Sequence, residues 1–202
     1  MKKNTKRKIL IVTGIYPPDI GGPASYAKIL AQRLSKDYDV RIITYSSVRK
    51  YDQDKDYSFK VKRVWKNNFW FFRHVAYAFR IFCACKNSDV IYSLSTLNGA
   101  IPSLMGAWFF KKKFYLRIAG DYAWQVAVEK NKTKLMIDDF QKSKKTGWIG
   151  FLHKTQVRSC KGAYKIIVPS EYLASIVSGW GIPRDKVKVI YNGVDFKPSE
   201  VT

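Results

Sequence analysis

Short apolar runs alternate with amphipathic stretches along most of the chain. The apolar runs predict β-strands at residues 8–13, 40–45, 59–64, 90–94, 114–118, 165–168 and 187–191. Apolar residues spaced three and four apart predict helices between them, at residues 23–35, 69–86, 100–110 and 171–178. Strands that alternate with helices predict an α/β fold with a doubly wound, mostly parallel sheet in a single domain.

Four stretches refine this picture. Residues 9–12 are continuously apolar, which is typical of a parallel strand covered on both faces. Residues 59–64 alternate apolar with basic side chains, which predicts an edge or half-exposed strand. Residues 48–57 are charged and predict a solvated loop. Residues 129–160 are polar and basic with scattered aromatics, and helices without clear boundaries are expected there, among them residues 154–160.

A glycine pair follows the first predicted strand. Gly21 and Gly22 have no Cβ, so a ligand can approach the backbone closely. Pro23 suits the first position of the helix that follows, and a helix N-terminus presents free N–H groups and a partial positive charge. The segment therefore predicts a contact with an anionic ligand, and the alternative is a tight turn that binds nothing.

Two further loops follow predicted strands of the same sheet. Gly120-Asp121 follows residues 114–118, and Ser170-Glu171 follows residues 165–168. In open parallel sheets, ligands bind beyond the carboxyl ends of the strands. Together with the glycine pair, these loops predict a cleft lined by backbone N–H groups, a carboxylate and aromatic side chains.

The composition of the chain indicates a negatively charged binding partner. The 202 residues carry a net charge of +22, and 47% hydrophobic residues are enough for a folded core. Such a charge attracts polyanions, whether nucleic acid, anionic lipid or a phosphorylated ligand. The cysteines at positions 83, 85 and 160 are too few for a disulfide framework, and only two histidines accompany them, so neither disulfides nor a metal site is expected.

Two stretches have the length or composition of membrane segments. Residues 90–110 carry no charge and are long enough to span a bilayer, but they contain Ser, Asn, Gly and Pro. A buried strand, a polar loop and a buried helix are predicted instead. The basic N-terminus resembles a signal peptide, but its apolar run breaks at Pro17-Pro18-Asp19, and this interpretation is rejected.

Residues 166–173, Ile-Ile-Val-Pro-Ser-Glu-Tyr-Leu, and residues 187–195, Val-Lys-Val-Ile-Tyr-Asn-Gly-Val-Asp, follow the glycine loop in a particular order and spacing. With that loop, they resemble the N-terminal domain of family 4 glycosyltransferases over about residues 8–196. The resemblance implies a Rossmann-like domain at residues 1–196, the N-terminal half of a GT-B fold, with residues 197–202 starting a linker. A separate C-terminal domain that binds a nucleotide-diphosphate sugar would be the partner.

The family resemblance also implies a reaction. A hexosyl group would pass from the nucleotide sugar to a glycan or lipid-linked acceptor, with retention of anomeric configuration and without a bound metal or other cofactor. This half would bind the acceptor and be inactive alone.

The resemblance assigns roles to several positions. Many relatives carry His-Gly after the strand at residues 114–118, but Ala119 stands at the histidine position here. Asp121 is therefore the candidate catalytic residue. The other assignments are a donor-phosphate and acceptor loop at Gly21 and Gly22, acceptor contacts at Gly120, Asp121, Tyr122 and Trp124, a cleft rim at Ser170 and Glu171, and an interdomain hinge at Asn192 and Gly193.

Each of these roles has an alternative. Asp121 can instead cap the next helix or pair with a surface lysine, and Tyr122 and Trp124 can pack rather than stack on a sugar. Ser170 can cap the helix at residues 171–178, and Glu171 can be a first-turn acid that interacts with the helix dipole.

The basic surface predicts a cytoplasmic protein on the inner face of a membrane, because relatives that build lipid-linked glycans often dock there. Anionic lipid attracts lysines beside aromatics. The candidates are residues 2–8, Arg63 and Lys66 beside Trp65, Phe69 and Trp70, residues 111–113, and residues 142–145 beside Trp148 and Phe151. A buried crossover helix is the alternative for residues 69–82.

Three other functions remain to be weighed. A non-catalytic membrane-docking subunit of a split glycosyltransferase would share the fold. A nucleic-acid binder would fit the charge, but no helix-turn-helix, zinc-finger or RNA-recognition signature is present, and no nucleic-acid partner is expected. A dinucleotide oxidoreductase is disfavoured because no Gly-x-Gly-x-x-Gly follows the first strand.

Overall fold

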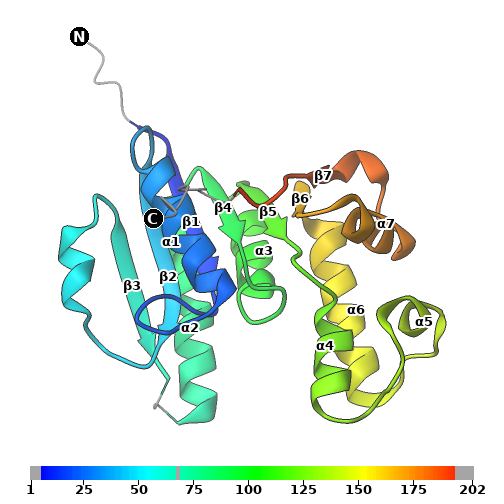
Figure 1. Ribbon diagram of the computed structural model, residues 1–202. Coiled ribbons are helices and arrows are strands. Elements are labelled where there is room, and N and C mark those ends of the chain that lie inside the picture. Colours follow the sequence, from blue (N-terminus) through cyan, green and yellow to red (C-terminus); the bar gives the residue numbers. More distant parts are fainter. Residues whose placement is uncertain (1–5, 67–68, 194–202) are drawn as a thin grey trace, which may run out of the picture.

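The computed structural model describes residues 6–66 and 69–193 of the chain (Figure 1). The strands are β1 (Lys8–Thr13), β2 (Asp39–Ser46), β3 (Lys60–Trp65), β4 (Val90–Ser93), β5 (Lys113–Arg117), β6 (Lys165–Val168) and β7 (Val187–Val189). The α-helices are α1 (Gly22–Leu34), α2 (Trp70–Lys86), α3 (Ala100–Phe109), α4 (Tyr122–Glu129), α5 (Ile137–Lys142), α6 (Gly147–Gly162) and α7 (Glu171–Gly179). Two short 3₁₀ turns complete the described elements, η1 (Asp52–Asp56) and η2 (Arg184–Lys186).

The strands form one seven-stranded sheet in the order β3-β2-β1-β4-β5-β6-β7. Every pairing is parallel, and Ile11 of β1 lies opposite Ile42 on one side and Tyr92 on the other. The predicted α/β fold with a doubly wound parallel sheet is confirmed. The predicted edge position of residues 59–64 is also confirmed, since β3 is an outermost strand.

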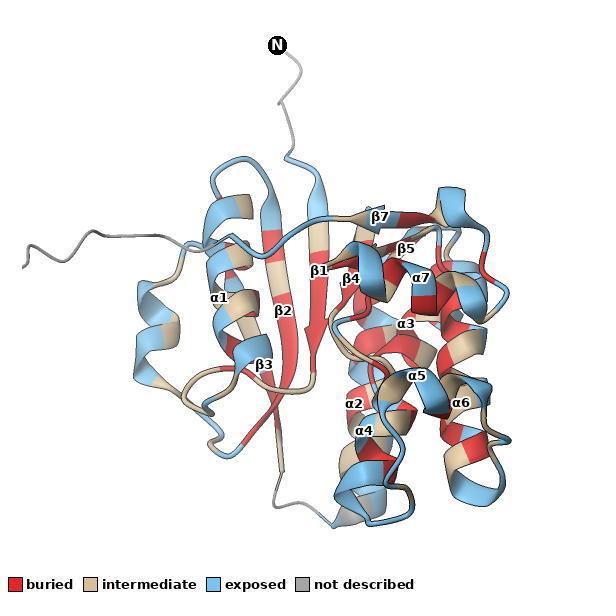
Figure 2. Cartoon of the chain, turned by 45° about the vertical axis from the view of Figure 1, so that its right-hand side comes forward, coloured by how far each residue is buried: buried red, intermediate tan, exposed pale blue. Residues whose placement is uncertain are grey.

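Helices cover both faces of this sheet. On one face, Ala27 and Ala31 of α1 pack with Ile11 of β1. On the other, side chains of α2, α3, α6 and α7 pack in a cluster that includes Leu10 and Val12 of the same strand. Successive side chains of a strand point to opposite faces, so the continuous apolar run of β1 serves two cores. Figure 2 shows β1 buried between the helical layers.

The predicted helices at residues 23–35 and 100–110 match α1 and α3 within a residue or two. The stretch at residues 129–160 contains α5 and most of α6, and α6 begins at Gly147, well before the predicted residue 154. Residues 48–57 form the predicted solvated loop, since none of them is buried. They contain η1, and Asp54 accepts two hydrogen bonds of 2.7 Å from Arg63, because a guanidinium buried on the edge strand needs a carboxylate partner.

Residues 90–110 form β4, a loop and α3, the elements that the sequence predicts, but α3 is only partly buried, since Met105, Trp108 and Phe109 are exposed. Among the described residues, no helix combines the length and apolar character needed to cross a bilayer. The predicted linker at residues 197–202 and the basic residues 2–5 lie outside the described residues.

Candidate functional site

The strand order of the sheet reverses direction beside β1. From β1 the chain turns one way to β2 and β3, then crosses back to β4 on the other side of β1. In sheets of this kind, a crevice forms at the carboxyl ends of the strands where the order reverses. Here that crevice is bordered by the loop after β1, by Leu94 after β4 and by Ala119 after β5.

Asp19 fixes the loop after β1. Its carboxylate accepts hydrogen bonds from the Ser47 hydroxyl at 2.5 Å and from Lys66 Nζ at 2.6 Å. Burial alone would raise the pKa of Asp19, but the hydrogen bonds from Lys66 and Ser47 outweigh it and lower the pKa. The loop that leads to the glycine pair is therefore tied to the segment after β2 and to the end of β3.

The glycine pair opens α1 without a side-chain cap. Gly21 is the N-cap residue, its carbonyl accepts from the N–H groups of Ala24 and Ser25, and Pro23 lies in the first turn, as predicted. A Cβ on Gly21 would lie 3.3 Å from the Ile15 side chain, whereas a Cβ on Gly22 would meet nothing within 4 Å. Gly22 therefore borders open space, which leaves room for a ligand at the N-terminus of the helix.

Arg117, the last residue of β5, lies opposite this helix N-terminus. Only 6% of the residue is exposed. Its Nη2 donates a 2.6 Å hydrogen bond to Asn192 Oδ1, and the guanidinium carbon lies 3.8 Å from the centre of the Tyr26 ring. Within the described part of the chain, Nη1 is buried and has no hydrogen-bond partner. A buried cationic donor without an acceptor is costly, which makes Nη1 a candidate position for an anion.

Two tyrosines, Tyr26 and Tyr92, lie close to Arg117. The hydroxyls of Tyr26 and Tyr92 lie 3.4 Å apart. Burial, and then the hydrogen bond to Tyr26, raises the pKa of Tyr92 well above its usual value, and the neighbouring Arg117 offsets only part of this rise. Tyr92 therefore remains a neutral hydroxyl at physiological pH, and the charge of Arg117 is not neutralised by it.

A cavity of about 240 Å³ joins these groups, lined by Gly22, Pro23, Tyr26, Leu94, Arg117, Ala119 and Asn192. None of these side chains carries a carboxylate. Pockets for whole small-molecule ligands are typically about 300–1,000 Å³, so this cavity suits one phosphate group or one sugar ring. We call this place the Arg117 pocket.

Asp121, the candidate catalytic residue, lies elsewhere and is fully buried. Its Oδ1 accepts from the Trp124 N–H at 3.1 Å and from Gln156 at 3.4 Å, and its Oδ2 accepts from Gln141 at 2.8 Å. The alternative role as a helix cap is confirmed, because this carboxylate caps α4 and ties it to α5 and α6. Its catalytic role stays a prediction.

The other predicted site residues are spread along the same edge. Tyr122 is partly exposed, whereas Trp124 packs against the α4–α6 cluster and donates from Nε1 to the Leu135 carbonyl at 3.0 Å. Ser170 caps α7, as expected, and Glu171 pairs with Arg184 on the surface at 2.7 Å. Of the predicted residues, the Arg117 pocket gathers Gly22 and Asn192. Gly120, Gly21 and Gly193 adjoin pocket-lining residues in the sequence, and their roles remain predictions.

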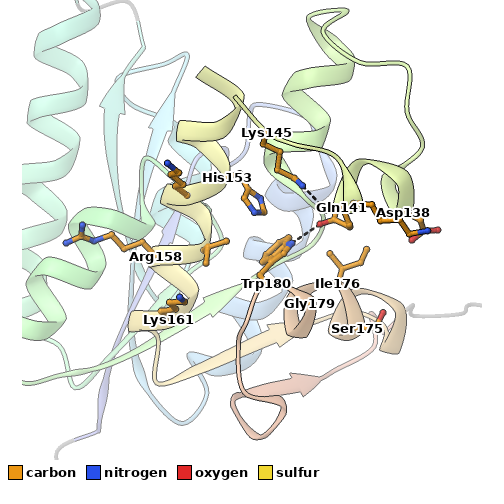
Figure 3. A pocket seen from close by; sticks show the side chains of 13 residues that line it. Asp138, Gln141, Lys145, His153, Arg158, Lys161, Ser175, Ile176, Gly179 and Trp180 are labelled. Carbon is orange, nitrogen blue, oxygen red and sulfur yellow. Dashed lines mark hydrogen bonds between the residues drawn. The ribbon is translucent and has the colours of Figure 1, made fainter. Parts of the chain in front are cut away.

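A larger cavity of about 1,030 Å³ lies among α5, α6 and α7 (Figure 3). Lysines and Arg158 surround it, but Arg158 points away from His153 and Trp180 in its centre. Lys145 Nζ already donates to three backbone carbonyls, and burial lowers the pKa of His153, which keeps it neutral. This cavity therefore offers fewer available charges to an anion than its lining suggests.

The three cysteines form no disulfide in the structure. Cys83, Cys85 and Cys160 are free thiols, and burial raises the pKa of Cys85 and of Cys160 to about 12. Among residues 6–66 and 69–193, no cluster of His, Cys, Asp or Glu is arranged to hold a metal ion.

The sequence analysis missed Arg117 and Tyr26. The signal for Arg117 was present: a charged residue within residues 114–118, an otherwise apolar run predicted to form a covered strand. Such a charge requires a partner or a ligand. Tyr26 carried no comparable signal, because an aromatic residue in the first turns of a helix is usually a packing residue.

The comparisons with known proteins agree with this architecture. The sequence model of Glycosyltransferase Family 4 matches residues 20–197. No curated protein sequence matches the chain. Among solved structures, Anabaena HepE in complex with UDP and glucose is similar, with a TM-score of 0.65, 13% identity, and coverage of 96% of this chain and 48% of that one. UDP-GlcNAc 2-epimerase from Methanocaldococcus jannaschii is also similar, with a TM-score of 0.58, 15% identity, and coverage of 90% and 45%.

At these identities, the structural likeness shows the fold alone. The chain spans about half the length of the solved proteins that it resembles.

Proposed function

The chain belongs to glycosyltransferase family 4, and on that premise we propose that it is the acceptor-binding half of an enzyme that transfers a hexosyl group. The donor is a nucleotide-diphosphate sugar, and the acceptor is a glycan or a lipid-linked glycan. A C-terminal donor-binding domain, supplied by another segment or another chain, faces the carboxyl ends of β1, β4 and β5. Asn192 and Gly193 are the hinge toward it.

The observation that carries this proposal is the unpaired Nη1 of Arg117 beside the N-terminus of α1. Both groups favour negative charge, and both line the same small cavity. A phosphate group is the anion that fits a fork of N–H donors on a guanidinium. The donor diphosphate and the phosphate of a lipid-linked acceptor share this chemistry.

In the proposed reaction, the Arg117 pocket stabilises the leaving group. A hydroxyl of the acceptor attacks the anomeric carbon, a new C–O bond forms, and the bond from that carbon to the diphosphate breaks. The hydroxyl proton leaves with the departing diphosphate, and the anomeric configuration is retained. Negative charge grows on the leaving group, and preorganised donors such as Arg117 and the Gly22 N–H stabilise it. We propose no metal in this step.

We also propose that the enzyme works at the inner face of a membrane, where a lipid-linked acceptor is held. The net charge of +22 supports this location, because an anionic leaflet attracts basic residues.

A binding titration tests the proposal. The chain is titrated with inorganic diphosphate while backbone amide signals are followed by NMR. We expect the largest shifts at Gly22 and Arg117. Binding should weaken about 10- to 100-fold in Arg117→Met but not in Arg184→Met, which removes an equal charge from the surface. Parallel titrations with UDP and with geranyl diphosphate distinguish a donor phosphate from a lipid phosphate. Diphosphate binding that is insensitive to Arg117→Met would overturn the proposal.

A second candidate is a non-catalytic, membrane-docking subunit of a split glycosyltransferase. One observation favours it: the pocket-lining side chains include no carboxylate or imidazole, since Ala119 stands where many relatives carry histidine. Vesicle binding without any diphosphate binding would support this candidate over the first.

A further inference from the structure

A row of exposed apolar side chains runs along α2. Phe72, Val75 and Phe79 are spaced three and four residues apart, so they lie on one face of the helix. Phe72 and Phe79 are each 66% exposed. The opposite face holds Tyr77 and Ile81, which are fully buried against the sheet. The helix therefore has one apolar face in the core and a second apolar face toward solvent, which packing of this domain does not require.

The row continues onto the neighbouring helix α3. Phe82 of α2 contacts Phe109, the last residue of α3, and Phe110, its C-cap, with ring centres 5.6 and 5.2 Å apart. The helices pack closely, because a Cβ on Gly106 would lie only 2.7 Å from the Cys85 sulfur. On the outer side of α3, Trp108 is 80% exposed, and Met105 and Phe109 are also exposed.

The combined surface is larger than a soluble monomer normally leaves uncovered. We define the α2–α3 face by its exposed members, Phe71, Phe72, Val75, Phe79, Met105, Trp108 and Phe109. At roughly 150–250 Å² for each aromatic side chain, its five aromatics, all more than half exposed, present several hundred Å². Patches above a few hundred Å² mark contact with a protein or a membrane.

Charge decides between these partners. Between Asp56 and Asp121, the sequence contains a single acidic residue, Asp89, and its carboxylate accepts a hydrogen bond from the Lys8 N–H. Lysines stand where the two helices end, at Lys86, the last residue of α2, and at positions 111–113 after α3. An exposed aromatic surface bordered by lysines and almost free of acids matches an anionic bilayer.

We propose that the α2–α3 face docks on the surface of an anionic lipid bilayer. The aromatic side chains enter the headgroup region, and the lysines contact lipid phosphates. Since α2 follows β3, it begins at the carboxyl edge of the sheet, the edge that carries the Arg117 pocket. The Arg117 pocket lies at that edge beside α1, which packs on the other face of the sheet. The inference rests on the proposed membrane location and names the surface that makes contact.

The structure separates this face from other basic and aromatic candidates. Arg63 is buried and pairs with Asp54, and Lys66 pairs with Asp19. Lys145 donates its amine to backbone carbonyls. Trp148 and Phe151 on α6 stack at 5.2 Å and are as exposed as Phe71, so they provide a matched control.

Co-sedimentation with vesicles tests the inference. The chain is mixed with vesicles of phosphatidylcholine alone or of phosphatidylcholine with added phosphatidylserine, because anionic lipid gives the vesicle surface a negative potential. Three proteins are compared: the wild type, Trp108→Ser/Phe109→Ser, and the control Trp148→Ser/Phe151→Ser. Circular dichroism establishes that each is folded, and light scattering at two concentrations reports the oligomeric state.

The expected result is salt-sensitive binding of the wild type to anionic vesicles only. The α2–α3 variant should bind at least about 10-fold more weakly, because each aromatic lost removes a favourable apolar contact with lipid, and the control should bind normally. Absence of wild-type binding would overturn the membrane location itself. Wild-type binding with an equal effect of both variants, or none, would overturn only the assignment to the α2–α3 face. A dimer that dissociates in the α2–α3 variant would show that a second copy covers this face instead.

Discussion

Replacing Arg117 with methionine should weaken anion binding while leaving stability almost unchanged. Methionine approximates the aliphatic part of arginine and carries no donors. The change removes the 2.6 Å hydrogen bond to Asn192 and the contact with the Tyr26 ring. It also removes the buried, unpaired Nη1.

The favourable and unfavourable contributions of Arg117 to the unfolding free energy nearly cancel. A hydrogen bond to a charged group contributes about 1.5–3 kcal/mol, and an unpaired buried donor costs about 1–3 kcal/mol, more when it is charged. Asn192 is exposed, so water can replace the lost partner. We expect a change in unfolding free energy within about 1 kcal/mol, which is a shift of about 2–4 °C in Tm for a chain of this size.

Affinity for diphosphate behaves differently, because nothing replaces the guanidinium. Loss of one charge-assisted hydrogen bond of about 1.5–3 kcal/mol weakens binding about 10- to 100-fold. Isothermal titration with inorganic diphosphate measures this change, and thermal unfolding followed by circular dichroism measures stability. Arg184→Met controls for the loss of one positive charge, because Arg184 is exposed and pairs with Glu171.

Two results would refute the reasoning. Equal affinities of Arg117→Met and Arg184→Met would show that Arg117 does not bind the anion. A Tm lowered by more than about 10 °C would show that Arg117 mainly stabilises the fold, since that shift corresponds to several kcal/mol.

Other predictions concern stability. Asp121→Ala should lower the unfolding free energy by about 3 kcal/mol, from a lost cap and the glutamine amides left unpaired. Calorimetry should show unchanged diphosphate affinity, and lost affinity at full stability would instead show that Asp121 contributes to the binding site. Because the pKa of Asp19 is lowered by folding, its pairing with Lys66 stabilises the protein above the unfolded pKa of about 3.9 and is lost as the pH falls through the lower, folded value. Acid titration of Asp19→Asn should therefore lack this part of the stability loss, and identical acid profiles would contradict it. Gly181 has φ +76°, so Gly181→Ala should cost about 1–2 kcal/mol in denaturant unfolding. Gly179→Ala should cost less, because Gly179 is the last residue of α7 and does not have a positive φ.

Much of the fold was predictable because its strongest patterns are local. The apolar run of β1 and the periodic stripes of α1 and α3 depend on burial by neighbouring layers, which hydrophobic spacing reports directly. The stretch around α5 and α6 was harder, because α6 exposes Trp148 and Phe151 and buries the polar Gln156. Its polar contacts to Asp121 come from residues distant in sequence, so spacing alone does not reveal where the helix begins.

The candidate site was predictable in position and only partly in residues. Loops at the carboxyl ends of parallel strands are grouped by topology, and Gly22 does border the cavity. The role of Asp121 depended on which side chains face it, and Gln141 and Gln156 occupy it from α5 and α6. Arg117 became a candidate only when its unpaired Nη1 was seen beside the helix N-terminus.

A crystal structure of the chain soaked with inorganic diphosphate tests the central claim most directly. The account predicts density for diphosphate in the Arg117 pocket, with an oxygen within about 3 Å of Nη1 and the Gly22 N–H directed toward it. Diphosphate bound only among α5, α6 and α7, in the larger cavity beside His153 and Trp180, with the Arg117 pocket empty, would contradict it.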